Sequence, residues 1–240
     1  MDLGINGKTA LVTAASKGLG LASALALAAE GVKLTICARG EEALRAAERQ
    51  IVDIGGQVMA IPADVTDPAV PAQLVEATAD RYGGLDILVA NAGGPPPGRA
   101  LDLDEAAIQQ AVNANLLTSV RLVKEAAPYM RAARWGRICL ITSYSIKQPI
   151  PTLALSNTAR TGLWAWAKTA ALELFGDGIT LNTACPGTHS TDRMKQLGGS
   201  TEGMGDPGDF GKVVAFLCSQ PAGYINATAV LVDGGATAGL

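Results

Sequence analysis

The chain has 240 residues, 48% of them hydrophobic, which is enough to bury the core of one large α/β domain or of two small ones. Its formal net charge of −3 and the absence of a lysine and arginine run argue against a nucleic-acid partner. The N-terminus lacks the basic and apolar stretches of a signal peptide, and no apolar run is long enough to span a membrane, so we expect a cytoplasmic protein without membrane contact.

Apolar runs alternate with helical patterns along the chain. Several runs are continuous Val, Ile and Leu stretches, typical of strands that are covered on both faces. The predicted strands span 9–13, 33–37, 57–61, 87–90, 137–142, 180–184 and 229–232, and the predicted helices span 18–30, 41–54, 69–82, 104–131, 152–175 and 207–219. This alternation predicts an α/β fold, a single doubly wound Rossmann domain over residues 1–240 with a seven-stranded parallel sheet and helices on both faces.

Two segments bear on the organisation of the chain. The stretch GGPPPG at 93–98 indicates a stiff loop after a strand and not a domain boundary. The predicted helix at 152–175 carries apolar residues on more than one stripe, which is typical of a helix buried on two sides. We therefore expect a homo-oligomer, a dimer or a tetramer.

The cysteine and histidine content limits which metal and redox sites the protein can form. The four cysteines are scattered and form no CxxC pair, which indicates small buried hydrophobes in a reducing compartment. His189 is the only histidine, so a histidine-rich metal site is excluded and we expect no metal.

The sequence TAASKGLG at 13–20 joins the first predicted strand to the first predicted helix. A pyrophosphate binds well at a helix N-terminus, where free N–H groups and the helix dipole favour anions, and glycines allow its close approach. A glycine-rich loop at the first turn of a β-α-β unit therefore predicts a dinucleotide site. The residues expected to contact the cofactor there are Thr13, Ala15, Ser16, Lys17, Gly18, Leu19 and Gly20.

Two cations suggest which dinucleotide binds. Lys17 lies inside the loop, and Arg39 ends the second strand, where NAD-binding proteins commonly carry an acid for the ribose 2′-hydroxyl. A guanidinium at that position can hold a 2′-phosphate instead. NADP(H) is thus expected in preference to NAD(H); the alternative is that both are solvated surface cations.

These motifs resemble the short-chain dehydrogenase/reductase family over essentially the whole chain, and most of all its β-ketoacyl-[acyl-carrier-protein] reductase branch. Ala14 replaces the first glycine of the family's TGxxxGxG, which implies a negative φ or a slightly shifted turn. The resemblance further implies an adenine contact at Asp64 and Val65, a cofactor wall at Asn91, Ala92 and Gly93, a nicotinamide border at Pro186, Gly187, Thr188 and Thr191, and a C-terminal VDGG at 232–235.

The catalytic centre departs from the family's pattern. Ser143 matches the family serine at the end of the fifth strand, and Asn115 resembles its helix asparagine, which holds a water in the proton relay. Where the family carries a tyrosine and a lysine, the ungapped alignment places Ser156 and Arg160. A serine is a far weaker acid than a phenol, and arginine stays protonated. This pair can therefore bind and polarise a substrate but is a poor proton donor.

Tyr144 offers another donor. It follows Ser143 directly, and Lys147 comes three residues later. Neighbours on an extended strand point to opposite faces, which argues against both hydroxyls reaching one carbonyl, but the strand ends here. Tyr144 is therefore either a proton donor or a residue that forms a wall of the substrate site or has a structural role.

Between Asp192 and Gly205 lie 12 residues rich in Gly, Ser and Met, fewer than in relatives with a helical substrate lid. This predicts a short, flexible lid over an adaptable pocket. His189 begins the segment; its backbone is expected near the nicotinamide and its side chain near the substrate, with or without a catalytic role.

The resemblance implies an NADP(H)-dependent oxidoreductase that transfers a hydride to or from a small carbonyl or alcohol substrate, similar to 3-oxoacyl reductases but with an atypical catalytic centre. The alternative is a catalytically impaired nucleotide-binding sensor or regulatory protein. A lyase or isomerase that reuses the fold is a third possibility.

Overall fold

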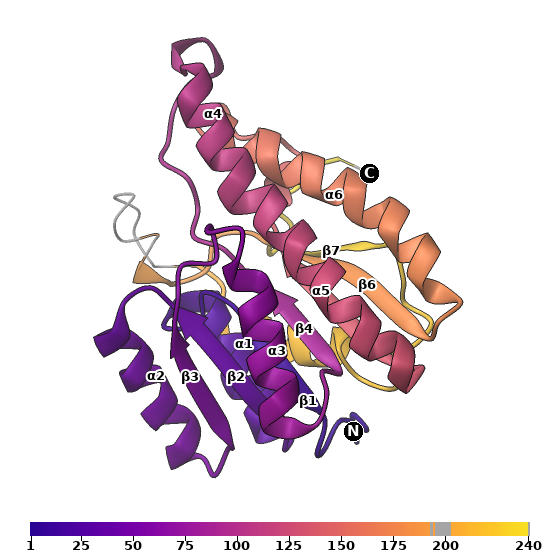
Figure 1. The fold of residues 1–240 in the computed structure, drawn as a ribbon. Coiled ribbons are helices and arrows are strands. Elements are labelled where there is room, and N and C mark those ends of the chain that lie inside the picture. The colour runs from indigo at the N-terminus through magenta and orange to yellow at the C-terminus, as the bar shows by residue number, and fades with distance from the viewer. Residues whose placement is uncertain (193, 195–202, 240) are drawn as a thin grey trace.

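A single parallel sheet forms the centre of the molecule (Figure 1), a computed structural model that describes residues 1–192, 194 and 203–239. Its seven strands follow the order β3-β2-β1-β4-β5-β6-β7, and every neighbouring pair is parallel, which confirms the predicted fold class. The strands are β1 Thr9–Val12, β2 Lys33–Ala38, β3 Val58–Pro62, β4 Ile87–Ala90, β5 Gly136–Ile141, β6 Ile179–Pro186 and β7 Ala229–Val232.

Two layers of helices cover the sheet. Side chains of α1 (Gly18–Ala29), α2 (Glu41–Asp53) and α8 (Pro207–Leu217) share one apolar core, and those of α3 (Val70–Tyr82), α5 (Thr118–Ala133) and α6 (Ala154–Phe175) share the other. Alternate residues of β1 enter the two cores, Ala10 and Val12 on one side and Leu11 on the other. This two-sided burial explains the unbroken apolar strands.

The predicted helix at 104–131 contains a π-helical segment that its residue pattern did not reveal. It consists of α4 (Glu105–Val112), a π turn over Asn113–Leu117 and then α5. The Thr118 hydroxyl donates to the Asn113 carbonyl at 2.9 Å, which stabilises the wider turn. Such π turns are frequent at functional sites, and this one packs against α6. Short 3₁₀ turns occur at Ala100–Asp102 and Tyr144–Ile146.

All four cysteines, Cys37, Cys139, Cys185 and Cys218, are buried and unbridged, as expected. Burial raises the pKa of the Cys37 thiol to about 12, so this thiol is a poor nucleophile. No helix among the described residues has the length and apolar character needed to cross a membrane.

Candidate functional site

The strand order reverses between β1 and β4, which is where doubly wound sheets bind ligands beyond the carboxyl ends of their strands. The Thr13 hydroxyl, just after β1, donates to the Asn91 carbonyl at 2.7 Å and accepts from the Asn91 N–H at 2.9 Å. The Asn91 side chain donates to the Ala14 carbonyl at 3.3 Å. The polar groups of Thr13 and Asn91 thus hold the two strand ends together.

The phosphate loop leaves a helix N-terminus open. Lys17 is the N-cap of α1, no side chain caps that helix, and its first backbone bond runs from Leu21 N to Lys17 O at 3.4 Å. The N–H groups of Gly18, Leu19 and Gly20 precede this bond, so they can donate to an anion. This geometry fits the pyrophosphate of a dinucleotide.

Two expectations for the same loop change in the structure. Ala14 has φ of 47°, so of the two predicted alternatives, a negative φ or a slightly shifted turn, the negative φ is wrong: the alanine adopts the left-handed conformation that the family's glycine would favour. Ala15 is fully buried, and its N–H donates to the Cys37 carbonyl at 3.0 Å, so Ala15 supports the loop and cannot offer that N–H to a phosphate. Ser16, half-buried, follows these two residues.

Gly20 shows how closely the loop is packed. A Cβ at this position would meet the Ala14 carbonyl oxygen and would lie 2.7 Å from the Asn91 side-chain nitrogen. Any larger residue would push the loop away from β4, which gives a physical reason for glycine here.

The end of the site beyond β2 and β3 carries exposed charges. Arg39 follows β2 and Lys17 is the N-cap of α1; both residues are exposed and accessible to a ligand. Asp64, beyond β3, accepts from the Thr66 N–H at 3.0 Å and from its hydroxyl at 2.8 Å. These bonds and the nearby Arg39 charge hold the pKa of the Asp64 carboxyl below its ordinary value. The Val65 carbonyl accepts from Thr118 at 3.1 Å, which fixes this loop to the π turn.

The loop after β6 folds back onto the phosphate loop. Gly187 donates to the Val232 carbonyl at 3.0 Å, and a Cβ on it would lie 2.7 Å from Asp233 Cα, so β6 and β7 end in close contact. The Thr191 methyl lies 3.6 Å from where a Gly18 Cβ would stand. Pro186 and Thr188 flank Gly187 at the same carboxyl edge.

His189 packs into the protein interior. Its side chain is 5% exposed, stacks edge-on against Phe210 at 5.2 Å and makes a 3.2 Å hydrogen bond with the Gly187 carbonyl. A Cβ on Gly205 would lie 2.9 Å from the imidazole ring. The expectation that this side chain faces the substrate is therefore wrong. The predicted flexible lid falls mainly on 193 and 195–202, outside the described residues.

Ser143 lies directly beyond β5 in an extended conformation. Its Oγ accepts from the Ser145 N–H at 3.1 Å, which leaves the hydroxyl hydrogen free to donate elsewhere. Tyr144 begins the 3₁₀ turn and is half-buried, and within the described residues its hydroxyl makes no hydrogen bond. Lys147 lies with its ammonium 5.6 Å from the centre of the Trp164 ring, not paired with the tyrosine.

Arg160 is 7% exposed and reaches across to the strand ends. Its guanidinium donates to the carbonyls of Ile141 at 2.9 Å, Thr142 at 2.8 Å and Ala92 at 3.4 Å. These bonds tie the end of β5 to the segment after β4, directly before Ser143. The sequence predicted only that Arg160 can bind and polarise; the structure adds this main-chain role, which residue type alone could not reveal.

Ser156 lies one helical turn before Arg160 on the buried side of α6 and is 8% exposed. The next residue, Asn157, has a role beside the candidate site that its position in the sequence did not predict. Its side chain donates to the Ile150 carbonyl at 2.8 Å and accepts from the Ile150 N–H at 3.3 Å, which holds the loop before α6. Gly98 adds a backbone bond to the Thr152 carbonyl at 2.8 Å, so the stiff segment 93–98, which includes Gly93, is anchored there too.

Asn115 lies in the π turn and is 3% exposed. Both its side-chain nitrogen and its oxygen are buried without a hydrogen-bond partner, and among the described side chains no other has two such atoms. Leaving both unpaired is costly, so the site is suited to a bound water or ligand atom. Within the described part of the chain, no group of three or more His, Cys, Asp or Glu could hold a metal ion.

Comparisons with known proteins agree with this geometry. A family model described as short chain dehydrogenase matches residues 8–201. A 3-oxoacyl-[acyl-carrier-protein] reductase from Synechocystis sp. is 32% identical and is aligned over 96% of this chain and 97% of its own.

Two solved structures share the fold. L-sorbose reductase from Gluconobacter frateurii, complexed with NADPH and L-sorbose, is 30% identical with a TM-score of 0.93, and the match covers 100% of both chains. A 7α-hydroxysteroid dehydrogenase, complexed with NADH and 7-oxo glycochenodeoxycholic acid, is 26% identical with a TM-score of 0.92, over 98% of this chain and 96% of its own. Similar proteins thus bind one or the other nicotinamide cofactor.

Proposed function

Because the chain belongs to the short chain dehydrogenase family, we propose that it is an NADP(H)-dependent oxidoreductase that transfers a hydride to or from a carbonyl or alcohol substrate, as 3-oxoacyl reductases do. The observation that carries the proposal is the uncapped N-terminus of α1, flanked by the exposed cations Lys17 and Arg39. Free N–H groups suit the pyrophosphate, and a guanidinium in place of an acid after β2 suits a 2′-phosphate.

Residues at the carboxyl edge of the sheet have different roles in the proposed reaction. The bound nicotinamide supplies or accepts the hydride. Ser143 donates its free hydroxyl hydrogen to the substrate oxygen, and Arg160 positions Ser143 through the Thr142 carbonyl. Asn115 holds a water that returns a proton to the site, and Ser156 adds a second hydroxyl. Tyr144 forms part of the substrate wall.

One observation favours a second candidate function. Ser156 and Arg160 stand where the family carries its proton donor and the lysine that assists it. A protein that keeps the phosphate loop without that pair can act as a nucleotide-binding sensor or regulatory subunit. NADPH binding without turnover on any carbonyl substrate would favour this alternative.

The proposal is tested by titrating the protein with NADPH and NADH, followed by cofactor fluorescence. We expect tighter binding of NADPH. Arg39→Ala should weaken NADPH binding about tenfold, a free-energy change of about 1.4 kcal/mol, and leave NADH binding unchanged. Arg49→Ala, another exposed arginine, is the matched control and should change neither value. Equal affinity for the two cofactors would contradict the NADP(H) preference.

We also propose that the protein is a homo-oligomer. Apolar side chains remain exposed around the end of α6: Leu172 is 70% and Phe175 41% exposed. The Phe175 ring packs edge-on against Tyr224, itself 90% exposed, at 6.2 Å. A second copy of the chain would cover this patch. Light scattering that finds a monomer at micromolar concentration would contradict it.

A further inference from the structure

Two side chains at the π turn hold the loop that follows β3. The Asn113 side-chain nitrogen donates to the Thr66 carbonyl at 3.0 Å, and the Thr118 hydroxyl donates to the Val65 carbonyl at 3.1 Å. A hydroxyl has a single hydrogen, and Thr118 also directs it to the Asn113 carbonyl at 2.9 Å. Since Thr118 divides its hydrogen between two acceptors, the bond from Asn113 is the undivided one of the two links to this loop.

The orientation of the Asn113 carboxamide is determined by its two partners. Its oxygen accepts from Nη1 of Arg121 at 2.8 Å, while its nitrogen bonds to Thr66. A guanidinium only donates and a carbonyl only accepts, so the oxygen and the nitrogen cannot exchange places. The bond from Arg121 is charge-assisted, which strengthens it. An aspartate at position 113 would keep this bond and lose the bond to Thr66.

Thr66 connects this anchor to Asp64. Its N–H donates to the Asp64 carboxylate at 3.0 Å and its hydroxyl at 2.8 Å, so residues 64–66 form a turn that is closed by its own bonds. These bonds fix Asp64 relative to Thr66 but not relative to the rest of the molecule. The bond from Asn113 does that, because it attaches the turn to a helical segment that packs against α6.

We propose that Asn113 is a positioning residue for the adenine half of the cofactor, which holds the 64–66 turn where the adenine and its ribose bind. This inference rests on the proposed function, with Asp64 and Val65 as the adenine contacts. A loop that is fixed before binding loses less conformational freedom when the ligand arrives, so fixing it raises the affinity. Asn113 does not need to touch the cofactor to have this effect.

The fragment 2′,5′-ADP, which is the adenosine half of NADPH, isolates this contribution. Its affinity is measured by isothermal titration calorimetry, and that of NADPH is measured in parallel. We expect Asn113→Ala and Asn113→Asp each to weaken the binding of both ligands about tenfold, since both variants lose the bond to Thr66. Arg121→Met keeps that bond and should weaken binding by no more than about threefold.

Asn226→Ala is the matched control, because Asn226 also links two backbone groups. It accepts from the Leu181 N–H at 2.9 Å and donates to the Ala171 carbonyl at 3.0 Å, just before β7, and its loss should leave both affinities unchanged. Equal weakening in Asn226→Ala, or full affinity in Asn113→Asp, would overturn the inference and leave the proposed function standing. Weakened binding of NADPH alone would also overturn it, because the loss would then lie outside the adenine half. If the unaltered protein binds neither ligand, the proposed function fails and the inference fails with it.

NMR titration of the Asp64 carboxyl separates positioning from a loss of the turn's own structure. The Thr66 donors and the nearby Arg39 charge hold the pKa of this carboxyl below its ordinary value. Since the internal bonds of the turn do not involve Asn113, we expect the pKa of Asp64 to stay low in Asn113→Ala while the affinity falls. A rise of this pKa to its ordinary value would mean that the turn itself has come apart, and would overturn the inference.

Discussion

Two buried arginine side chains contact opposite ends of β5: Arg137 belongs to the strand, and Arg160 reaches it from α6. Their surroundings differ. At the amino edge, Arg137 donates from Nε to the Ser219 carbonyl at 2.9 Å and from Nη1 to the Gly136 carbonyl at 2.8 Å. At the carboxyl edge, Arg160 donates to carbonyls in the same way. Since the two residues share the type of bond and the degree of burial, their neighbours decide what each can do.

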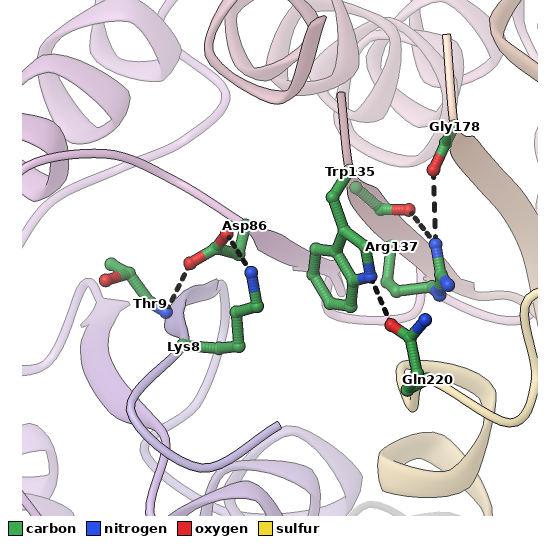
Figure 2. Close-up of polar contacts among 8 residues, drawn as sticks. Lys8, Thr9, Asp86, Trp135, Arg137, Gly178 and Gln220 are labelled. Atoms are coloured by element: carbon green, nitrogen blue, oxygen red, sulfur yellow. Dashed lines mark hydrogen bonds and ion pairs between the residues drawn. The ribbon is translucent and has the colours of Figure 1, made fainter. Parts of the chain in front are cut away.

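Arg137 belongs to a group of five side chains linked by polar and cation–π contacts, which we call the amino-edge cluster: Lys8, Asp86, Trp135, Arg137 and Gln220. Figure 2 shows the Trp135 ring between the two cations, with Lys8 at 4.2 Å and Arg137 at 4.5 Å from its centre. The indole N–H donates to Gln220 at 2.6 Å, and Lys8 pairs with Asp86 at 3.0 Å. Each member of the cluster therefore has a partner.

At the carboxyl edge, two turns that pack against α6, the helix of Arg160, leave hydrogen bonds unmade. Both side-chain atoms of Asn115 and the Ser145 hydroxyl are buried without partners. Paired polar groups stabilise a fold, whereas unpaired buried ones cost free energy and persist where function requires them. Single unpaired hydroxyls also occur at Thr35 and at Thr180, the register partner of Arg137, so the contrast rests on Asn115, whose two side-chain atoms both lack a partner. On that ground we assign stability to the amino edge and ligand binding to the carboxyl edge.

The sharpest test of the contrast removes each arginine in turn. Arg160→Met and Arg137→Met should each lower the free energy of unfolding by about 2–4 kcal/mol, because buried carbonyls lose their donors. Arg160→Met should also lower turnover per folded molecule about 100-fold, while Arg137→Met leaves it unchanged. Urea unfolding and NADPH oxidation measure the two effects. Equal losses of turnover in the two variants would contradict the assignment of different roles to the two edges of the sheet.

Two glycines provide a smaller test. In Gly20→Ala the new Cβ would meet the Ala14 carbonyl oxygen, and in Gly178→Ala it would meet the Arg134 carbonyl oxygen near the amino edge. Both substitutions should lower stability by about 1–3 kcal/mol through the forced backbone shift. Only Gly20→Ala should weaken NADPH binding, by about tenfold to 100-fold in a fluorescence titration. Weakened binding in Gly178→Ala would show that the two edges are coupled.

The smallest expected effect concerns a partnered group at the carboxyl edge. Thr66→Ala should raise the pKa of the Asp64 carboxyl towards its ordinary value, because the hydroxyl donor is lost. Since the folded-state pKa is depressed, the stability it contributes is present above the unfolded value of about 3.9 and is lost as the pH falls through the folded value. Asp64 is exposed, so the change should stay below about 1 kcal/mol.

NMR titration of the Asp64 carboxyl measures this shift. Thr237→Ala is the matched control, because Thr237 donates in the same way to Asp233 at 2.6 Å. It should raise the pKa of Asp233 and leave that of Asp64 unchanged. A shift of Asp64 in the control would mean that the two carboxyls are not independent.

The sequence alone determined the strand and helix pattern, the parallel sheet and the glycine-rich loop. These follow from local features, because apolar runs covered on both faces and a glycine turn before a helix are visible in the residue order. The family match over 8–201 agrees with the resemblance that those motifs carried.

Only the tertiary structure decided what the unusual residues do. Ala14 adopts a positive φ, His189 turns into the core, and the π turn buries Asn115 without a partner. Arg160 donates to the carbonyls of Ile141, Thr142 and Ala92, which are 18 to 68 residues away along the chain. Residue type states what a side chain can donate or accept; which acceptors it meets depends on the packing of α6 against the sheet, and the order of residues does not display that packing.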